Sequence, residues 1–230
     1  MRARPTRLVL LGHPVAHSLS PVFQQAALDA AGLAVRYEAV DVTPDALDGV
    51  FDALIASGAA GNVTIPHKPA VFARCAYRTP LAMRTGAVNT WWVDDGVLHG
   101  DNTDVAGFDD AACSLLRDVP SGARVALLGA GGAARAVAVA VADWPGATLA
   151  IWNRSLARAR ELAPLGPAAT RVEEIMADAL RGADLVVNAT SVGLHDDGII
   201  MNPAVLGRGC ACLDLVYRAD VTPWVRLARA

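Results

Sequence analysis

The sequence predicts an α/β protein with two domains, each built on a mostly parallel β-sheet. Short apolar runs typical of strands alternate with longer runs typical of helices, which is the pattern of parallel sheets. Hydrophobic residues make up 53% of the 230 residues, enough for substantial packed cores. Turn residues at 119–122 separate two such series. We therefore predict domains at residues 1–104 and 105–230, with the boundary inside a connecting helix.

The first half alternates between the two kinds of element. Strand patterns occupy residues 7–11, 37–42 and 62–65, and helical patterns occupy residues 21–31, 44–56 and 80–85. Residues 89–93 and 97–100 flank Asp94-Asp95-Gly96, which predicts a β-hairpin. A serine oxygen can accept from the first amides of a helix, and proline suits the first helical position. Ser20, before Pro21, is therefore expected to cap the first helix.

The second half repeats the alternation. Strand patterns occupy residues 124–128, 149–152, 184–188 and 210–217, and helical patterns occupy residues 131–142 and 156–162. Strands separated by helices again predict a parallel sheet.

Composition excludes several classes of function. No apolar run reaches the ~20 residues that cross a bilayer, and the apolar run after the basic N-terminus is too short for a signal peptide. We therefore expect a soluble, cytoplasmic protein. The four cysteines show neither metal-ligand spacing nor a disulfide framework. With a net charge of −3 and no basic run, we expect no nucleic-acid partner. No two histidines or acids have metal-ligand spacing, so we expect no metal. We expect a small-molecule substrate and no membrane partner. The sequence leaves open whether the protein forms a homodimer.

Lys68 is the only lysine in a chain whose other 19 basic residues are arginine. Lysine can lose its proton near neutral pH when its surroundings demand it, whereas arginine effectively cannot. Lys68 is therefore our candidate for proton transfer. The neighbouring His67 is a weaker candidate, since a lone histidine more often has a structural role.

A glycine-rich turn follows the strand pattern at 124–128. Gly129, Gly131 and Gly132 open a helix, the context in which backbone amides hold a pyrophosphate; Ala134 replaces the usual third glycine. The next strand ends in Asn153-Arg154, where NAD sites have an acidic residue. Guanidinium groups there favour a 2′-phosphate and therefore NADP. For Arg160 we prefer a solvated helix face.

Short polar side chains follow several strand patterns of the first half. They lie in "GNVTIPHK", "GAVNT" and "GDNTD", and they are Thr64, Lys68, Asn89, Thr90, Asn102, Thr103 and Asp104. Hydroxyls and amides, with one lysine and one carboxylate, suit a small anionic molecule rich in oxygen. Lys68 and Asp104 would carry out proton transfer.

At this point the motifs match a known family. The chain resembles shikimate dehydrogenases along nearly its whole length, through "GHPVAHSLSP", "GNVTIPHK", "GAVNT", "GDNTD", "GAGGAAR", "NRSLAR", "NATSVG" and "LDLVYRADVTP" in order. The resemblance implies an N-terminal substrate domain, a C-terminal Rossmann-type domain, and NADP-linked interconversion of 3-dehydroshikimate and shikimate in aromatic amino-acid biosynthesis.

The resemblance also implies roles for individual residues. The substrate carboxylate meets Ser18 and Ser20, the ring hydroxyls meet Thr64, Asn89, Asp104 and Tyr217, and the catalytic pair is Lys68 with Asp104. The residues at the NADP positions are Gly129, Ala130, Gly131, Gly132, Ala133, Asn153, Arg154, Ser155, Arg158, Thr190 and Leu215.

Two alternatives stay open. A paralogue that uses quinate would share the hydroxyl-binding residues. Family members usually continue with a glycine-containing loop and returning helices that carry a substrate-contacting glutamine, whereas this sequence ends at Ala230. On that ground, a non-catalytic binding protein is the second alternative. Pro80 also replaces an acidic residue found in many members.

Overall fold

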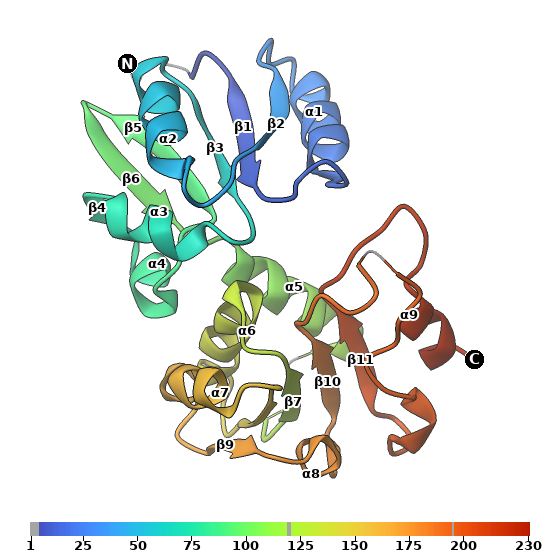
Figure 1. Ribbon diagram of the computed structural model, residues 1–230. Helices are drawn as coiled ribbons and strands as arrows, with labels where there is room; N and C mark the ends of the chain where they lie inside the picture. Colours follow the sequence, from blue (N-terminus) through green and yellow to red (C-terminus); the bar gives the residue numbers. More distant parts are fainter. Residues whose placement is uncertain (1–4, 119–120, 195) are drawn as a thin grey trace. The chain divides into compact units, whose positions relative to one another are not determined.

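The computed structural model describes residues 5–118, 121–194 and 196–230, so Val119 and Pro120 of the expected turn lie outside the described residues. The chain divides into two compact units, Met1–Thr103 and Asp104–Ala230. The second unit begins at the first residue of helix α5 (Asp104–Leu116). Each unit contains one β-sheet with helices packed against it (Figure 1).

The first unit contains a six-stranded sheet in its described part, in the order β2-β1-β3-β5-β6-β4. The strands are β1 (Leu8–Gly12), β2 (Tyr37–Asp41), β3 (Ala60–Val63), β4 (Tyr77–Arg78), β5 (Thr90–Asp94) and β6 (Val97–Asp101). The helices are α1 (Ser20–Ala30), α2 (Leu47–Ala56), α3 (Lys68–Arg74) and α4 (Pro80–Thr85). Only the pairings of β5, with β3 and with β6, are antiparallel. The expected hairpin is confirmed, with positive φ at Asp95 and Gly96, as a two-residue turn requires.

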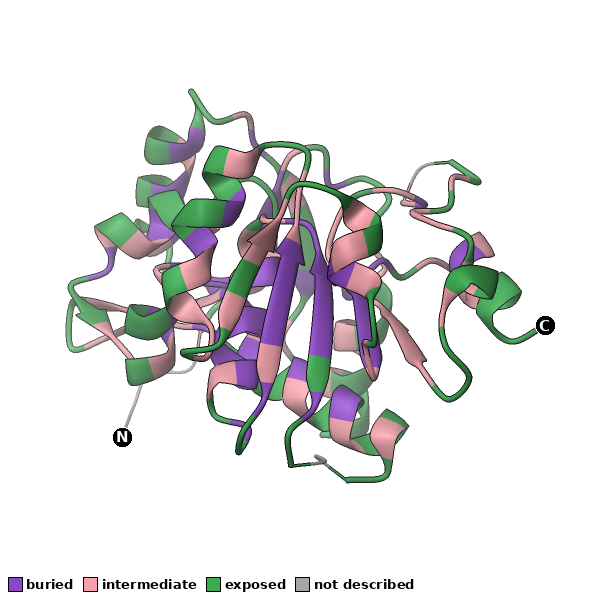
Figure 2. Cartoon of the chain, turned by 90° about the horizontal axis from the view of Figure 1, so that it is seen from below, coloured by how far each residue is buried: buried purple, intermediate pink, exposed green. Residues whose placement is uncertain are grey.

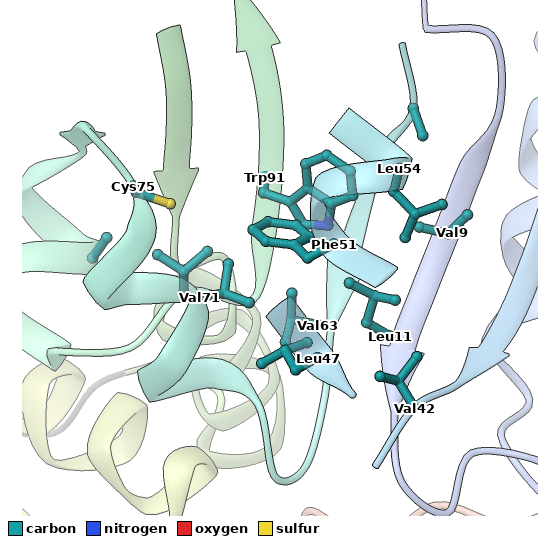
Figure 3. Close-up of a cluster of buried hydrophobic side chains, with 13 residues drawn as sticks. Val9, Leu11, Val42, Leu47, Phe51, Leu54, Val63, Val71, Cys75 and Trp91 are labelled. Carbon is teal, nitrogen blue, oxygen red and sulfur yellow. The ribbon is translucent and has the colours of Figure 1, made fainter. Parts of the chain in front are cut away.

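Alternating residues of β1 face the two sides of the first sheet, because successive side chains of a strand point in opposite directions. Val9 and Leu11 join the buried cluster around Phe51 of α2 (Figure 3). In that cluster the rings of Phe51 and Trp91 meet edge to face, with centroids 4.8 Å apart. Leu10 packs in a second cluster with Leu28 of α1. The sheet therefore separates two apolar layers.

The start of α1 differs from our prediction. The helix begins at Ser20, and Leu19 occupies the capping position without a side-chain hydrogen bond, so the prediction that Ser20 caps this helix is wrong. The hydroxyl of Ser18 instead accepts from the backbone N–H of Ser20 at 3.2 Å. Because the helix starts one residue earlier than its apolar pattern indicates, Ser20 lies inside the first turn.

The second unit contains a five-stranded sheet in its described part, in the order β11-β10-β7-β8-β9, with every pairing parallel. The strands are β7 (Arg124–Leu128), β8 (Thr148–Trp152), β9 (Thr170–Glu173), β10 (Leu185–Asn188) and β11 (Ala211–Asp214). The helices after α5 are α6 (Gly132–Ala142), α7 (Leu156–Leu162), α8 (Met176–Leu180) and α9 (Pro223–Ala228), with 3₁₀ turns at Ala163–Leu165 and Pro203–Val205. The strand order reverses between β7 and β10, which is where doubly wound sheets bind ligands.

The last strand is shorter than predicted. It ends at Asp214 rather than continuing to residue 217. The reason is local: the Asp214 side chain accepts from the backbone N–H of Val216 at 3.1 Å, a turn that draws the chain out of the strand.

Both faces of the second sheet are covered. Ala126 and Leu128 of β7 belong to a cluster that includes Trp224 of α9, while the alternate residues Val125 and Leu127 are equally buried. Figure 2 shows the buried residues concentrated in strands and the exposed ones on outer helix faces and loops. The Phe108 ring of α5 stacks on Trp144, just after α6. None of the described helices has the length and apolar content that a membrane span requires.

Candidate functional site

Polar side chains gather at one edge of the first unit's sheet. The carboxyl ends of the parallel strands β1, β3 and β6 lie at this edge, together with the start of the antiparallel β5. Two backbone bonds join Asn89, just before β5, to both neighbours: its carbonyl accepts from Val63 at 2.8 Å, and its N–H donates to Asp101 at 3.0 Å. Residues far apart in sequence therefore meet here.

Asn89 is held in a network of neutral polar groups. Its Oδ1 accepts from the N–H of Thr103 at 2.9 Å and from the hydroxyl of Thr90 at 3.0 Å. The hydroxyl of Thr90 in turn accepts from Asn62, whose Oδ1 accepts from the Tyr37 hydroxyl at 2.8 Å. Asn89 is 7% exposed. The side chain is thus fixed in orientation before any ligand arrives.

Asn102, which the sequence placed in the same polar group, has a different environment. It is fully buried, and its side-chain nitrogen donates to the carbonyl oxygen of Ala87 at 3.0 Å and to the Thr85 hydroxyl at 3.1 Å. Asn102 therefore supports the end of α4.

The two serines of the opening motif stand at the entrance of α1. Their hydroxyl oxygens are 3.2 Å apart. The loop before them is anchored by Asp41, which accepts from the N–H of Val15 at 2.9 Å and bonds the His13 ring at 2.7 Å. The His13 hydrogen bond is the main cause that lowers the pKa of Asp41. A helix N-terminus favours anions, so this pair of hydroxyls suits a carboxylate.

Thr64 and Lys68 follow β3 at the same edge. A Cβ at Gly12 would collide with Cγ2 of Thr64, so the glycine at the end of β1 allows this close approach. His67, 1% exposed, bonds the carbonyl oxygen of Val42 through Nε2 at 2.6 Å, an anchoring contact. Lys68 begins α3, and its carbonyl accepts from the N–H of Val88 at 3.0 Å, which fixes the lysine backbone beside Asn89.

The glycine turn lies at the carboxyl end of β7 in the second unit. Gly129 has φ +120°, and a Cβ there would come within 2.7 Å of the carbonyl oxygen of Ala189. Gly131 is the N-cap of α6 and provides no side-chain hydrogen bond to the first-turn amides. Ala134 is fully buried at the third-glycine position. An uncapped helix N-terminus behind a close-packed glycine turn fits a pyrophosphate.

The end of β8 carries amides and arginines rather than a carboxylate. Asn153 donates to the carbonyl of Ser155 at 2.9 Å, and the Ser155 hydroxyl caps α7 by accepting from the N–H of Arg158. Within the part of the chain that the structure describes, the exposed side chains of Arg154 and Arg158 form no ion pair. Arg160 is 68% exposed and lies 3.9 Å from Glu174. Two guanidinium groups thus remain available for a 2′-phosphate.

Thr190 and Leu215 follow β10 and β11 at the same edge. The hydroxyl of Thr190 donates to Oδ1 of Asn188 at 2.7 Å, and the N–H of Leu215 donates to the carbonyl of Asn188 at 3.0 Å. Sequence reasoning included Asn188 and its neighbour Asp214 in the motifs "NATSVG" and "LDLVYRADVTP" but assigned no role to either residue. The signal was present, since each is the polar last residue of an otherwise apolar strand.

Comparisons with known proteins show the family of the chain. Residues 10–91 match the family model described as the shikimate dehydrogenase substrate binding domain. The chain is 42% identical over 233 residues to the shikimate dehydrogenase (NADP(+)) of Mesorhizobium japonicum. This match covers 95% of this chain and 80% of that protein. The chain belongs to the shikimate dehydrogenase family.

Solved structures of shikimate dehydrogenases share the fold. The Aquifex aeolicus enzyme is 34% identical with a TM-score of 0.89, covering 100% of this chain and 85% of its own. The Thermus thermophilus enzyme, in complex with NADP(H) and shikimate, is 39% identical with a TM-score of 0.85, covering 97% of this chain and 83% of its own.

The predicted shikimate dehydrogenase site residues divide between the two units. Ser18, Ser20, Thr64, Lys68 and Asn89 lie at the polar edge of the first sheet. The glycine turn 129–133, residues 153–158, Thr190 and Leu215 lie at the carboxyl edge of the second. Asp104 and Tyr217 also belong to the second unit, at the start of α5 and after β11. Tyr217 is 53% exposed.

Proposed function

We propose that this chain catalyses the reversible NADPH-dependent reduction of 3-dehydroshikimate to shikimate, a cytoplasmic step of aromatic amino-acid biosynthesis. The observation that carries the proposal is the polar edge of the first sheet. There the only lysine of the chain follows β3, beside fixed hydroxyl and amide groups, in a chain 42% identical to a shikimate dehydrogenase.

The substrate is held mainly by neutral donors. Ser18 and Ser20 bind its carboxylate at the entrance of α1, where hydroxyl donors and helix amides act together. Thr64, Asn89, Asp104 and Tyr217 bind the ring hydroxyls. Because Asn89 is fixed by Thr90 and Thr103, its second side-chain N–H is presented as a donor in a defined direction.

The residues of the second unit fit NADP. Gly129, Ala130, Gly131, Gly132 and Ala133 would hold the pyrophosphate, since the first turn of α6 has no side-chain cap and its amides are available. Asn153, Arg154, Ser155 and Arg158 would bind the ribose that carries the 2′-phosphate, and Thr190 and Leu215 would contact the rest of the cofactor. When bound, NADPH supplies a hydride to the carbonyl carbon of the substrate.

Lys68 moves the proton. As the substrate carbonyl becomes a hydroxyl, the ammonium of Lys68 donates a proton to its oxygen. In the reverse direction the neutral amine removes that proton. Asp104 is the acidic residue of the proposed catalytic pair. Arginine could not replace lysine in this role, because it does not release its proton.

The test is NADP⁺ reduction by the purified 230-residue chain, followed by NADPH absorbance. The substrates are shikimate, quinate and none, each with NADP⁺ or NAD⁺. We expect NADPH formation with shikimate and NADP⁺, at a higher kcat/KM than in any other combination. A folded protein that forms no NADPH with shikimate would overturn the proposal, and faster turnover of quinate would move it to the quinate paralogue.

A further inference from the structure

The Asp214 carboxylate joins three segments at the carboxyl edge of the second sheet. Its Oδ1 accepts from the side-chain nitrogen of Asn188 at 2.9 Å and from the N–H of Val216 at 3.1 Å. Its Oδ2 accepts from the hydroxyl of Thr222 at 2.7 Å. Asn188 is fully buried and Thr222 is 4% exposed. One side chain thus connects the end of β10, the end of β11 and the cap of α9.

These hydrogen bonds continue to residues of the proposed site. Oδ1 of Asn188 accepts from both the N–H and the hydroxyl of Thr190, at 3.0 and 2.7 Å. On the other side, Asp214 and Thr222 close the segment that carries Leu215 and Tyr217. The Asp214 carboxylate is therefore linked by hydrogen bonds both to Thr190, a proposed cofactor-binding residue, and to the segment of Tyr217, a proposed substrate-binding residue.

A second contact ties the same two loops together farther from the sheet. Nη1 of Arg218 donates to the carbonyl oxygen of Asp196 at 2.7 Å and lies 3.3 Å from the Asp197 carboxylate. The loop after β11 is thus held at its base by Asp214 and along its length by Arg218. The loops after β10 and β11 are thus connected at two places.

A carboxylate in this position costs stability. Burial raises the pKa of Asp214, although its hydrogen bonds to Thr222, Val216 and Asn188 act in the opposite direction. No basic side chain pairs with it among the residues that the structure describes. An apolar residue would avoid the desolvation penalty but could not accept from three donors in three segments.

We propose that Asp214 is a positioning residue for the dehydrogenase reaction, which places Thr190 on the cofactor side and Tyr217 on the substrate side through Asn188 and Thr222. This inference rests on the proposed function. It assigns Asp214 no contact with the reacting atoms, and its effect passes through the two loops.

The test compares Asp214→Ala with the same substitution at a second aspartate of the sheet, Asp184. Asp184, at the opposite edge, accepts from the N–H of Arg124 at 2.9 Å and pairs with its guanidinium. We expect Asp214→Ala to raise the KM values for shikimate and for NADP⁺ together, each roughly tenfold. Asp184→Ala should lose stability with both KM values unchanged. Asp214→Asn, which keeps one acceptor oxygen, should stay within roughly threefold of wild type.

Two outcomes overturn the inference. One is a folded Asp214→Ala variant whose KM values equal those of wild type. The other is a rise in the KM values of Asp184→Ala as large as the rise in Asp214→Ala. If Asp214→Ala does not fold, Thr222→Val and Thr222→Ser replace it, because only serine keeps the hydroxyl that Asp214 accepts from. Valine should then raise the KM for shikimate and serine should not; equal values in the two variants would refute the role.

Amide hydrogen exchange separates this inference from the proposed function. Without any ligand, the amides of Thr190 and Val216 should exchange faster in Asp214→Ala and remain protected in Asp184→Ala. Inactivity of the wild-type chain toward shikimate would refute the proposed function and leave this measurement interpretable. Unchanged exchange at both amides in Asp214→Ala would refute the linkage itself.

Discussion

The side-chain amide of Asn89 donates to the hydroxyl of Thr103 at 2.9 Å, which ties the residue before β5 to the segment after β6. The oxygen of the same side-chain amide accepts from the backbone N–H of Thr103. Because both ends of the amide are engaged, Asn89 cannot turn freely. A substrate hydroxyl that reaches it would meet an already oriented group, which reduces the ordering cost of binding.

Asn89→Ala should weaken substrate binding more than cofactor binding. We expect a free energy of unfolding lower by about 2–3 kcal/mol, since buried hydrogen bonds are lost and partners are left unsatisfied. The KM for shikimate should rise roughly tenfold, with the KM for NADP⁺ unchanged. Steady-state kinetics and urea unfolding check both.

Asn62→Ala is the matched control for that variant. Asn62 belongs to the same network, between Tyr37 and Thr90, but has no assigned contact with substrate. It should lose similar stability and keep the KM for shikimate near wild type. An equal rise in KM in both variants would show that the network, rather than Asn89 itself, governs binding.

Lys68→Arg tests proton transfer. Arginine keeps the positive charge but does not release its proton, so turnover should fall while the substrate still binds. General acid–base catalysis contributes ~10²–10⁴-fold, so we expect kcat to fall at least roughly a hundredfold, with the KM for shikimate within about threefold. A kcat near that of wild type would remove Lys68 from the mechanism.

Much of the fold could be predicted because its central strands are buried on both faces. Such strands appear in the sequence as short continuous apolar runs, and residues 124–128 and 156–162 match β7 and α7 at both ends. Two of the edge strands, β4 and β9, were missed for the converse reason. β4 is only Tyr77–Arg78, and β9 reads Thr-Arg-Val-Glu, a largely polar segment that gains its strand character only by pairing with β8.

The site residues divide in the same way. Glycines and short polar residues after strands are visible in the sequence, because each is a local pattern. The bond between Asn188 and Asp214 is not, because it depends on the register of β10 against β11 across 26 residues. The role of Ser18 as acceptor for the α1 amide was hidden too, since it depends on where the helix begins.

Arg154 and Arg158 should determine cofactor preference. Neither has an ion pair in the described part of the chain, so both can face a 2′-phosphate. The double variant Arg154→Gln/Arg158→Gln should raise the KM for NADP⁺ by at least roughly tenfold and leave the KM for NAD⁺ unchanged. Arg160→Gln, which removes only the contact with Glu174, is the control and should change neither value. Retained NADP⁺ preference in the double variant would contradict this assignment.

Gly129→Ala should disrupt the turn that holds the pyrophosphate. A Cβ there would meet the carbonyl oxygen of Ala189 at 2.7 Å, and φ +120° disfavours any side chain. We expect a loss of about 2–4 kcal/mol in unfolding free energy and no measurable NADP⁺ binding by calorimetry. Gly207→Ala, where nothing lies within 4 Å, should leave both unchanged. Normal NADP⁺ affinity in Gly129→Ala would show that the turn tolerates a side chain.

Two aspartates, Asp214 and Asp184, should make contributions to the stability of the second unit that change with pH in opposite directions. Burial raises the pKa of Asp214 above the ordinary 3.8, so its stabilising contribution is present below that value and is lost as the pH rises through the folded pKa. Hydrogen bonding to Arg124 lowers the pKa of Asp184, so its contribution is present above 3.8 and is lost as the pH falls through the folded pKa. Relative to wild type, Asp214→Asn should therefore become more stable as the pH increases, and Asp184→Asn should become less stable. Urea unfolding between about pH 3 and 7 measures how the stability difference between each variant and wild type changes with pH. The same change in both variants would contradict the burial of Asp214.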